Sequence, residues 1–114
     1  MNASVKIVPY EPGAARVYHR QTGADLGYVL QNFHENWTPY CDGRPVGAAV
    51  GYRIEAAEAL YALNQFSSVS SPLADSIEYG EKWVTVVRSD GRVHVLGRDA
   101  VEARRPFSDE ERST

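Results

Sequence analysis

Residues 54–65 (IEAAEALYALNQ) are dominated by strong helix formers and contain no glycine or proline, which predicts a helix. The preceding half of the chain and residues 83–96 instead hold short runs of β-branched and aromatic residues, separated by glycine, proline and Asp-Gly dipeptides. That pattern is typical of strands joined by tight turns. The chain is therefore predicted to be an α+β domain, in which a mainly antiparallel sheet carries one principal helix on one face.

The predicted helix has a polar and an apolar side. Its polar positions form one stripe that also includes Ala62: Glu55, Glu58 and Gln65. Leu60 and Leu63 lie on the apolar side, so we expect both in the core and Glu58 in solvent. On this interpretation, truncating either leucine to alanine costs on the order of 2–5 kcal/mol, whereas Glu58→Ala is mild.

Four runs before the helix predict strands: residues 5–8, 16–20, 27–33 and 37–40. Pro39 cannot donate a hydrogen bond to a neighbouring strand, so the fourth strand should lie at an edge or carry a bulge. Asp42-Gly43 predicts a turn, because both residues tolerate a positive φ. Residues 46–50 (VGAAV) have small side chains, over which the following segment is expected to pack closely.

Residues 83–88 and 92–96 predict the clearest hairpin of the chain. A two-residue turn at Asp90-Gly91 would place Val86 opposite Val95. Both faces of this hairpin are partly apolar, which indicates that it is added to a larger sheet. The motif Trp…Asp-Gly-Arg occurs here and also at residues 37–44, and a strand followed by a turn explains both occurrences.

The chain is short enough to form a single domain, residues 1–114, and its composition divides it into four parts. These are a strand-strand-strand-helix unit at 26–66, a mobile serine-rich connection at 67–76, the added hairpin at 77–103 and a frayed charged tail at 104–114.

The residues that carry catalytic chemistry do not form a recognisable motif. Cys41 and His34 could be a nucleophile and its base, but Cys41 lies beside a turn and not at a helix N-terminus that would lower its pKa. His19, His34 and His94 fall on separate predicted segments without ligand spacing. We therefore predict no catalytic residue, no metal, no cofactor and no enzymatic activity.

Net charge and aromatic content indicate which kind of macromolecule the chain binds. The net charge of −3 is spread evenly, which disfavours nucleic acid as a partner. Seven tyrosines and two tryptophans are many for this length; they serve either protein binding or sheet packing, and both interpretations stay open. The candidate binding residues are three aromatic side chains and two basic ones: Tyr28, Trp37, Tyr40, Arg44 and Arg53.

The sequence also bears on location. It shows no signal peptide and no apolar run long enough to span a membrane, and its one cysteine fits a reducing compartment. We expect a small soluble protein of the cytoplasm that does not bind membranes. The oligomeric state is left open.

The order of motifs in residues 26–66 resembles a known family. The motifs are Gly27-x-Val29, Trp37, Asp42-Gly43, Gly51-Tyr52-Arg53 and the helix opening at Glu55-Ala56. They resemble the three-stranded-sheet-plus-helix unit of the arm-type DNA-binding domains of phage and transposon integrases and of the related AP2 domains. They are also similar to small accessory proteins of phages and mobile elements.

Two functions stay open. The first, which we favour because the chain is small, mildly acidic, rich in aromatic residues and without a catalytic motif, is a non-enzymatic interaction module, an accessory protein of a phage or mobile element that binds and modulates a host protein. The second, which the resemblance implies, is a DNA-binding module whose sheet enters the major groove, where Arg44 and Arg53 would contact DNA. The corresponding strands also offer Gln31 and Asn32, and acidic Glu35 and Asp42 lie between these two residues and Arg44, which again disfavours DNA.

Overall fold

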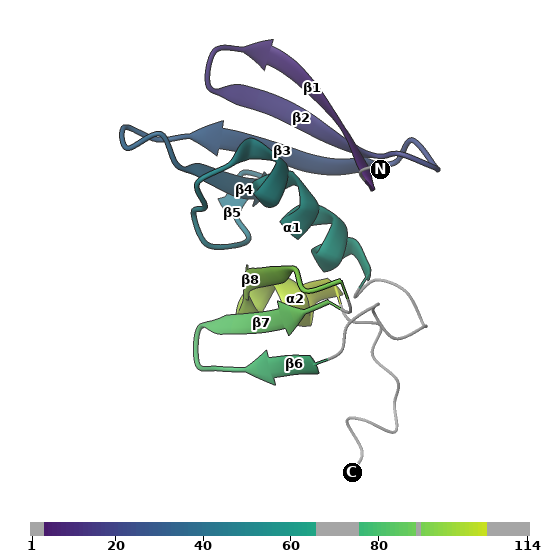
Figure 1. Ribbon diagram of the computed structural model, residues 1–114, viewed down its shortest axis with the longest axis vertical. Helices are drawn as coiled ribbons and strands as arrows, with labels where there is room; N and C mark the ends of the chain where they lie inside the picture. Colours follow the sequence, from purple (N-terminus) through teal and green to yellow (C-terminus); the bar gives the residue numbers. More distant parts are fainter. Residues whose placement is uncertain (1–3, 66–75, 89, 105–114) are drawn as a thin grey trace.

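The computed structural model describes residues 4–65, 76–88 and 90–104, and these form an α+β fold with two antiparallel sheets (Figure 1). The first sheet runs in chain order: β1 (Val5–Glu11), β2 (Ala14–His19), β3 (Asp25–Gln31), β4 (Trp37–Cys41) and β5 (Arg44–Pro45). The second follows α1 (Arg53–Gln65) and precedes α2 (Arg98–Arg104): β6 (Ser76–Tyr79), β7 (Trp83–Val87) and β8 (Val93–Gly97). The predicted fold class is confirmed.

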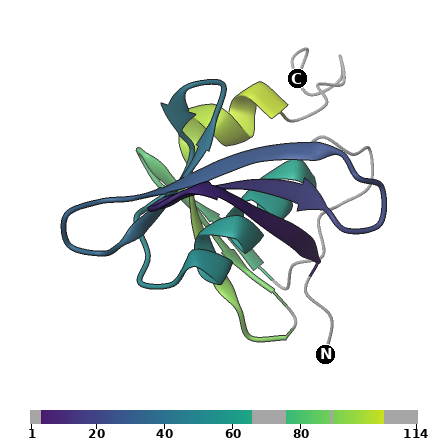
Figure 2. The ribbon, with the colours of Figure 1, turned by 90° about the horizontal axis from the view of Figure 1, so that it is seen from above.

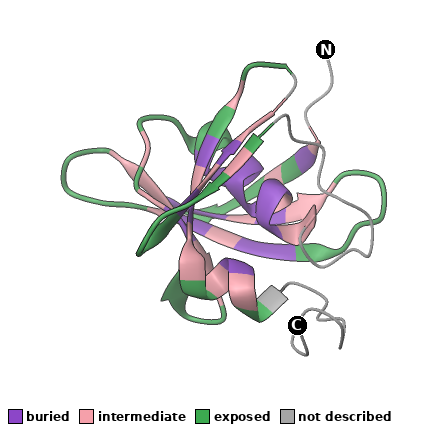
Figure 3. Ribbon diagram, turned by 90° about the horizontal axis from the view of Figure 1, so that it is seen from below, coloured by how far each residue is buried: buried purple, intermediate pink, exposed green. Residues whose placement is uncertain are grey.

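Helix α1 lies between the two sheets (Figure 1). It packs against β1, β3 and β4 of the first sheet and against β8 of the second. Leu60 and Leu63 are fully buried, as predicted, and the buried residues gather where the strands meet this helix (Figure 3). Together with valines and alanines from both sheets they form one hydrophobic core.

Gly27 allows the close approach of α1 to the first sheet. Its φ of +128° belongs to a region that glycine adopts far more easily than other residues. A side chain at this position would overlap the carbonyl oxygen of Tyr40 and crowd the methyl groups of Leu60. The side chain of Leu60 on α1 therefore packs directly against the backbone of β3 at Gly27.

Most strand predictions are confirmed, with shifted bounds. β1 continues through Pro9 to Glu11, which is possible because β1 is the edge strand of its sheet. The prediction that the strand with Pro39 lies at an edge or carries a bulge is wrong: β4 lies between β3 and β5, Pro39 pairs with Val29 of β3, and its carbonyl accepts from the N–H of Val46 at 2.9 Å. Asp42 and Gly43 have φ values of 54° and 80°, as the predicted turn requires.

Residues 46–50 lie against β8 of the second sheet. The N–H of Gly97 donates to the carbonyl of Val46 at 2.8 Å, and the N–H of Ala48 donates to the carbonyl of Val95 at 3.0 Å. β8, a segment far along the chain, therefore packs closely against these small residues. A Cβ atom on Gly47 would lie 3.0 Å from the Val95 carbonyl oxygen, which explains the small side chain there.

The β7–β8 hairpin is confirmed, but its predicted register is wrong by one residue. Val86 pairs with His94, not with Val95. The N–H of Gly91 donates to the carbonyl of Arg88, and Gly91 has a φ of +90°, so three residues and not two close the loop. The hairpin also pairs with β6 in a sheet of its own and is not added to the first sheet as a strand pair.

Two predicted segments fall largely outside the described residues: the connection at 67–76, of which only Ser76 is described, and the tail at 104–114, of which only the backbone of Arg104 is described. Helix α2 occupies the end of the predicted hairpin segment 77–103 and was not expected. None of the described helices is long and apolar enough to cross a membrane.

Candidate functional site

The face of the first sheet that points away from α1 carries a row of aromatic and basic side chains. Strand register places Arg16 opposite Tyr28, and Tyr28 opposite Tyr40. Alternate residues of a strand point to opposite faces. Because Val17, Val29 and Pro39 are buried on the α1 side, the three row residues point outward. We call Arg16, Tyr28 and Tyr40 the outer row.

The outer row is an ordered stack. The rings of Tyr28 and Tyr40 lie 5.5 Å apart with an interplanar angle of 12°. The guanidinium group of Arg16 lies 5.8 Å from the centre of the Tyr28 ring, within the range of a cation–π interaction. Arg16 also donates to Asp25 at 2.5 Å, and this hydrogen bond raises the pKa of Arg16. The side chains of the row are therefore held in place.

The three residues of the outer row are partly exposed, and neither described helix covers them. Within residues 4–65, 76–88 and 90–104, the two helices and the second sheet all lie on the other side of the first sheet, which Figure 2 shows from above. Val8 continues the row on β1 and Pro45 continues it on β5, and both are exposed. Together with Val8 and Pro45, the outer row extends across all five strands of the sheet.

The structure brings four of the five candidate binding residues together in two separate pairs: Tyr28 with Tyr40, and Trp37 with Arg53. Trp37 lies on the opposite face of β4, where it packs against the core and Arg53 lies 6.0 Å from its ring. Arg44 is exposed in β5. Arg16 was missed as a candidate, because only the pairing of β2 with β3 places it on Tyr28.

Cys41 and His34 do not form a catalytic pair. His34 lies in the loop before β4 and Cys41 is the last residue of that strand, so the length of β4 separates them. The thiol of Cys41 lies 3.8 Å from the carboxylate of Asp42, and a negative charge does not activate a thiol. The described residues contain no group of three or more His, Cys, Asp and Glu that could hold a metal ion.

Glu58 is not in solvent, contrary to the prediction from the helix stripe. Its exposed fraction is 3%, because the β7–β8 hairpin covers this part of α1. Arg92 donates a hydrogen bond to the carboxylate, and Arg88 lies 3.6 Å from the same oxygen. Arg88 also lies 5.5 Å from the ring of Tyr61. This buried cluster joins α1 to the second sheet.

His94 lies beside this cluster and is 6% exposed. Burial lowers its pKa to about 4, and the positive charges of Arg88 and Arg92 act in the same direction, so the imidazole is neutral at pH 7. A cavity of about 400 Å³ is lined by His94, Glu58 and Arg92, among others. Within this cavity the carboxylate of Glu58 contacts Arg92 and Arg88.

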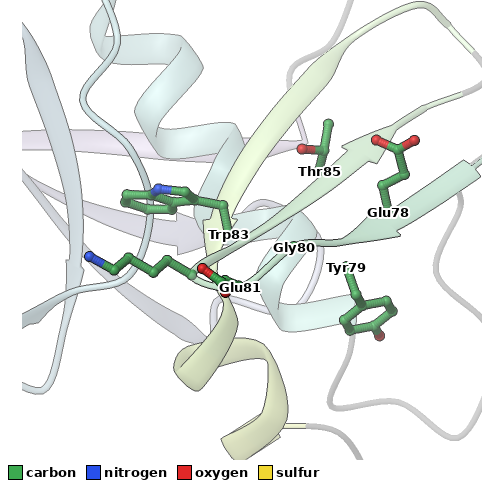
Figure 4. A pocket seen from close by; sticks show the side chains of 7 residues that line it. Glu78, Tyr79, Gly80, Glu81, Trp83 and Thr85 are labelled. Carbon is green, nitrogen blue, oxygen red and sulfur yellow. The ribbon is translucent and has the colours of Figure 1, made fainter.

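A second cavity, of about 520 Å³, opens beside the turn at residues 80–82 (Figure 4). Trp83 and Tyr79 both line it, but their rings point in different directions from the turn (Figure 4). They do not form one aromatic platform as the outer row does.

The comparisons with known proteins add no relative: no family model, no curated protein and no solved structure matches this chain.

Proposed function

We propose that this protein is a small non-enzymatic interaction module that binds a partner protein through the outer row. The observation that carries the proposal is the stack of Tyr28 on Tyr40 with Arg16 over it, on a sheet face that neither described helix covers. Tyrosine and arginine are enriched among the residues that dominate binding energy at protein interfaces. Rings that are already stacked lose little conformational freedom on binding.

The charges around the row favour a protein over DNA. Arg16 already contacts the carboxylate of Asp25, so a phosphate group would have to compete with this carboxylate for the guanidinium. The net charge of −3, which is spread evenly along the chain, also favours a protein over DNA. An accessory protein of a phage or mobile element that modulates a host protein is the class of function that the sequence resemblance supports.

A DNA-binding module is the second candidate. It is favoured by the antiparallel strands β2–β4 with α1 on one face, and by the exposed basic side chains of Lys6 on β1 and Arg44 on β5. In this alternative the sheet face would enter a groove and these side chains would contact phosphates.

Affinity capture with matched variants tests the proposal. We expect a specific protein to be captured from nuclease-treated lysate by the wild type and by Tyr52→Ser, a control at an exposed tyrosine outside the row. The double variant Tyr28→Ser/Tyr40→Ser should bind that protein at least about tenfold more weakly, because loss of a hot-spot residue costs more than about 1.4 kcal/mol. Circular dichroism should show that all three proteins are folded.

Two results would contradict the proposal. Equal capture by the double variant would show that the outer row is not the binding surface. Capture that disappears after nuclease treatment would favour the DNA-binding alternative.

A further inference from the structure

The loop between β3 and β4 displays a phenylalanine in solvent. Phe33 has an exposed fraction of 101%, whereas the next most exposed large hydrophobic residue among those described, Tyr52, reaches 71%. Phenylalanine has no polar atom that could justify such exposure by hydrogen bonding. An apolar ring that is fully hydrated in the isolated protein releases water when a partner covers it.

Hydrogen bonds hold the loop that carries Phe33. The side-chain oxygen of Asn32 accepts from the N–H groups of His34 at 2.8 Å and Asn36 at 3.0 Å. The N–H of Asn32 donates to the carbonyl of Asn36 at 2.9 Å, and the N–H of Glu35 donates to the carbonyl of Asn32 at 3.0 Å. Glu35 adopts a φ of 63°, which is uncommon for a residue with a side chain. These hydrogen bonds therefore hold the backbone of the loop that carries Phe33.

The loop is continuous with the outer row. Leu30 pairs with Thr38 between the Tyr28–Tyr40 pair and the loop, and two residues along a strand return to the same face. A partner that covers the row and extends along the β3–β4 hairpin thus reaches Phe33.

Resting on the proposed function, we infer that Phe33 is the insertion anchor of the same interaction. Its ring enters an apolar pocket of the partner protein, and the rim of that pocket carries a lysine or arginine opposite Glu35. An aromatic side chain buried in a pocket is the usual form of a binding hot spot.

The charges of the loop identify the kind of partner. Residues 31–36 (QNFHEN) contain one carboxylate and no lysine or arginine. Membrane surfaces and nucleic acids are both anionic, and proteins that insert an apolar side chain into them surround it with basic residues. A pocket in a protein with a basic rim is the complementary surface.

The test measures the affinity of the captured partner for four forms of the full chain. Compared with the wild type, Phe33→Ser should raise the Kd at least about tenfold, whereas Phe33→Leu, which keeps an apolar side chain, should stay within about threefold. Glu35→Gln should raise the Kd about two- to threefold at low salt and less at high salt, because a charge at the rim is screened. The melting temperature should not change for either Phe33 variant, since the ring makes no buried contact.

Each outcome separates the anchor from the outer row. If Phe33→Ser binds like the wild type while Tyr28→Ser/Tyr40→Ser does not, the outer row stands and the anchor is overturned. If Phe33→Ser loses binding and the tyrosine variant keeps it, the anchor stands and the outer row is overturned. Failure to capture any protein overturns both. Binding of the wild type to vesicles with about 30% anionic lipid, lost in Phe33→Ser, would show that Phe33 enters a membrane instead.

Discussion

Glu58→Ala should lower the free energy of unfolding by about 3 kcal/mol, as expected when one partner of a buried ion pair is removed. The variant leaves Arg88, whose side chain is 13% exposed, without its counter-charge. The contribution of Arg92 is smaller, because its side chain is 37% exposed and water screens the charge. Urea denaturation followed by circular dichroism measures the loss.

Glu55→Ala is the matched control for Glu58→Ala. Glu55 is exposed in the first turn of the same helix, so its replacement should change the free energy of unfolding by less than about 0.5 kcal/mol. Equal effects of the two substitutions would place Glu58 in solvent and would contradict the buried cluster.

Leu60→Ala and Leu63→Ala should each cost about 2–5 kcal/mol, because each removes methyl groups that are fully buried between the two sheets. Small domains are stable by only about 5–15 kcal/mol, so either variant should melt well below the wild type. Ile54→Ala, at the exposed start of the same helix, is the control and should cost less than about 1 kcal/mol. If Ile54→Ala lowered the melting temperature as much as the two leucine variants do, the assignment of Leu60 and Leu63 to the buried side of α1 and of Ile54 to its exposed start would be contradicted.

The helix and the turns were predictable because local chemistry determines them. Residues 54–65 lack helix breakers, and Asp42-Gly43 tolerates the positive φ values that the turn requires. Errors arose where a distant segment decides the outcome. Glu58 belongs to a polar stripe of the helix, yet Arg88 and Arg92 of the β7–β8 hairpin cover and pair it.

The candidate site was predictable only in part. Tyr28 and Tyr40 stand out as aromatic residues of two strands joined by a short loop, and antiparallel pairing stacks them. Arg16 could not be assigned to them, because a register irregularity between Val17 and Tyr18 shifts the pairing of β2 with β3. Phe33 was expected within a strand, and only the hydrogen bonds of Asn32 place it in the loop.

Photo-crosslinking from the outer row tests most directly whether this face binds a protein. A benzophenone amino acid replaces Tyr28 in one variant and, as a control, the exposed Tyr52 in another, and both are irradiated in living cells. We expect one discrete adduct with a protein from position 28 and none from position 52. An adduct from position 52 alone, or no adduct from position 28 in a folded variant, would contradict the assignment of the outer row as the binding surface.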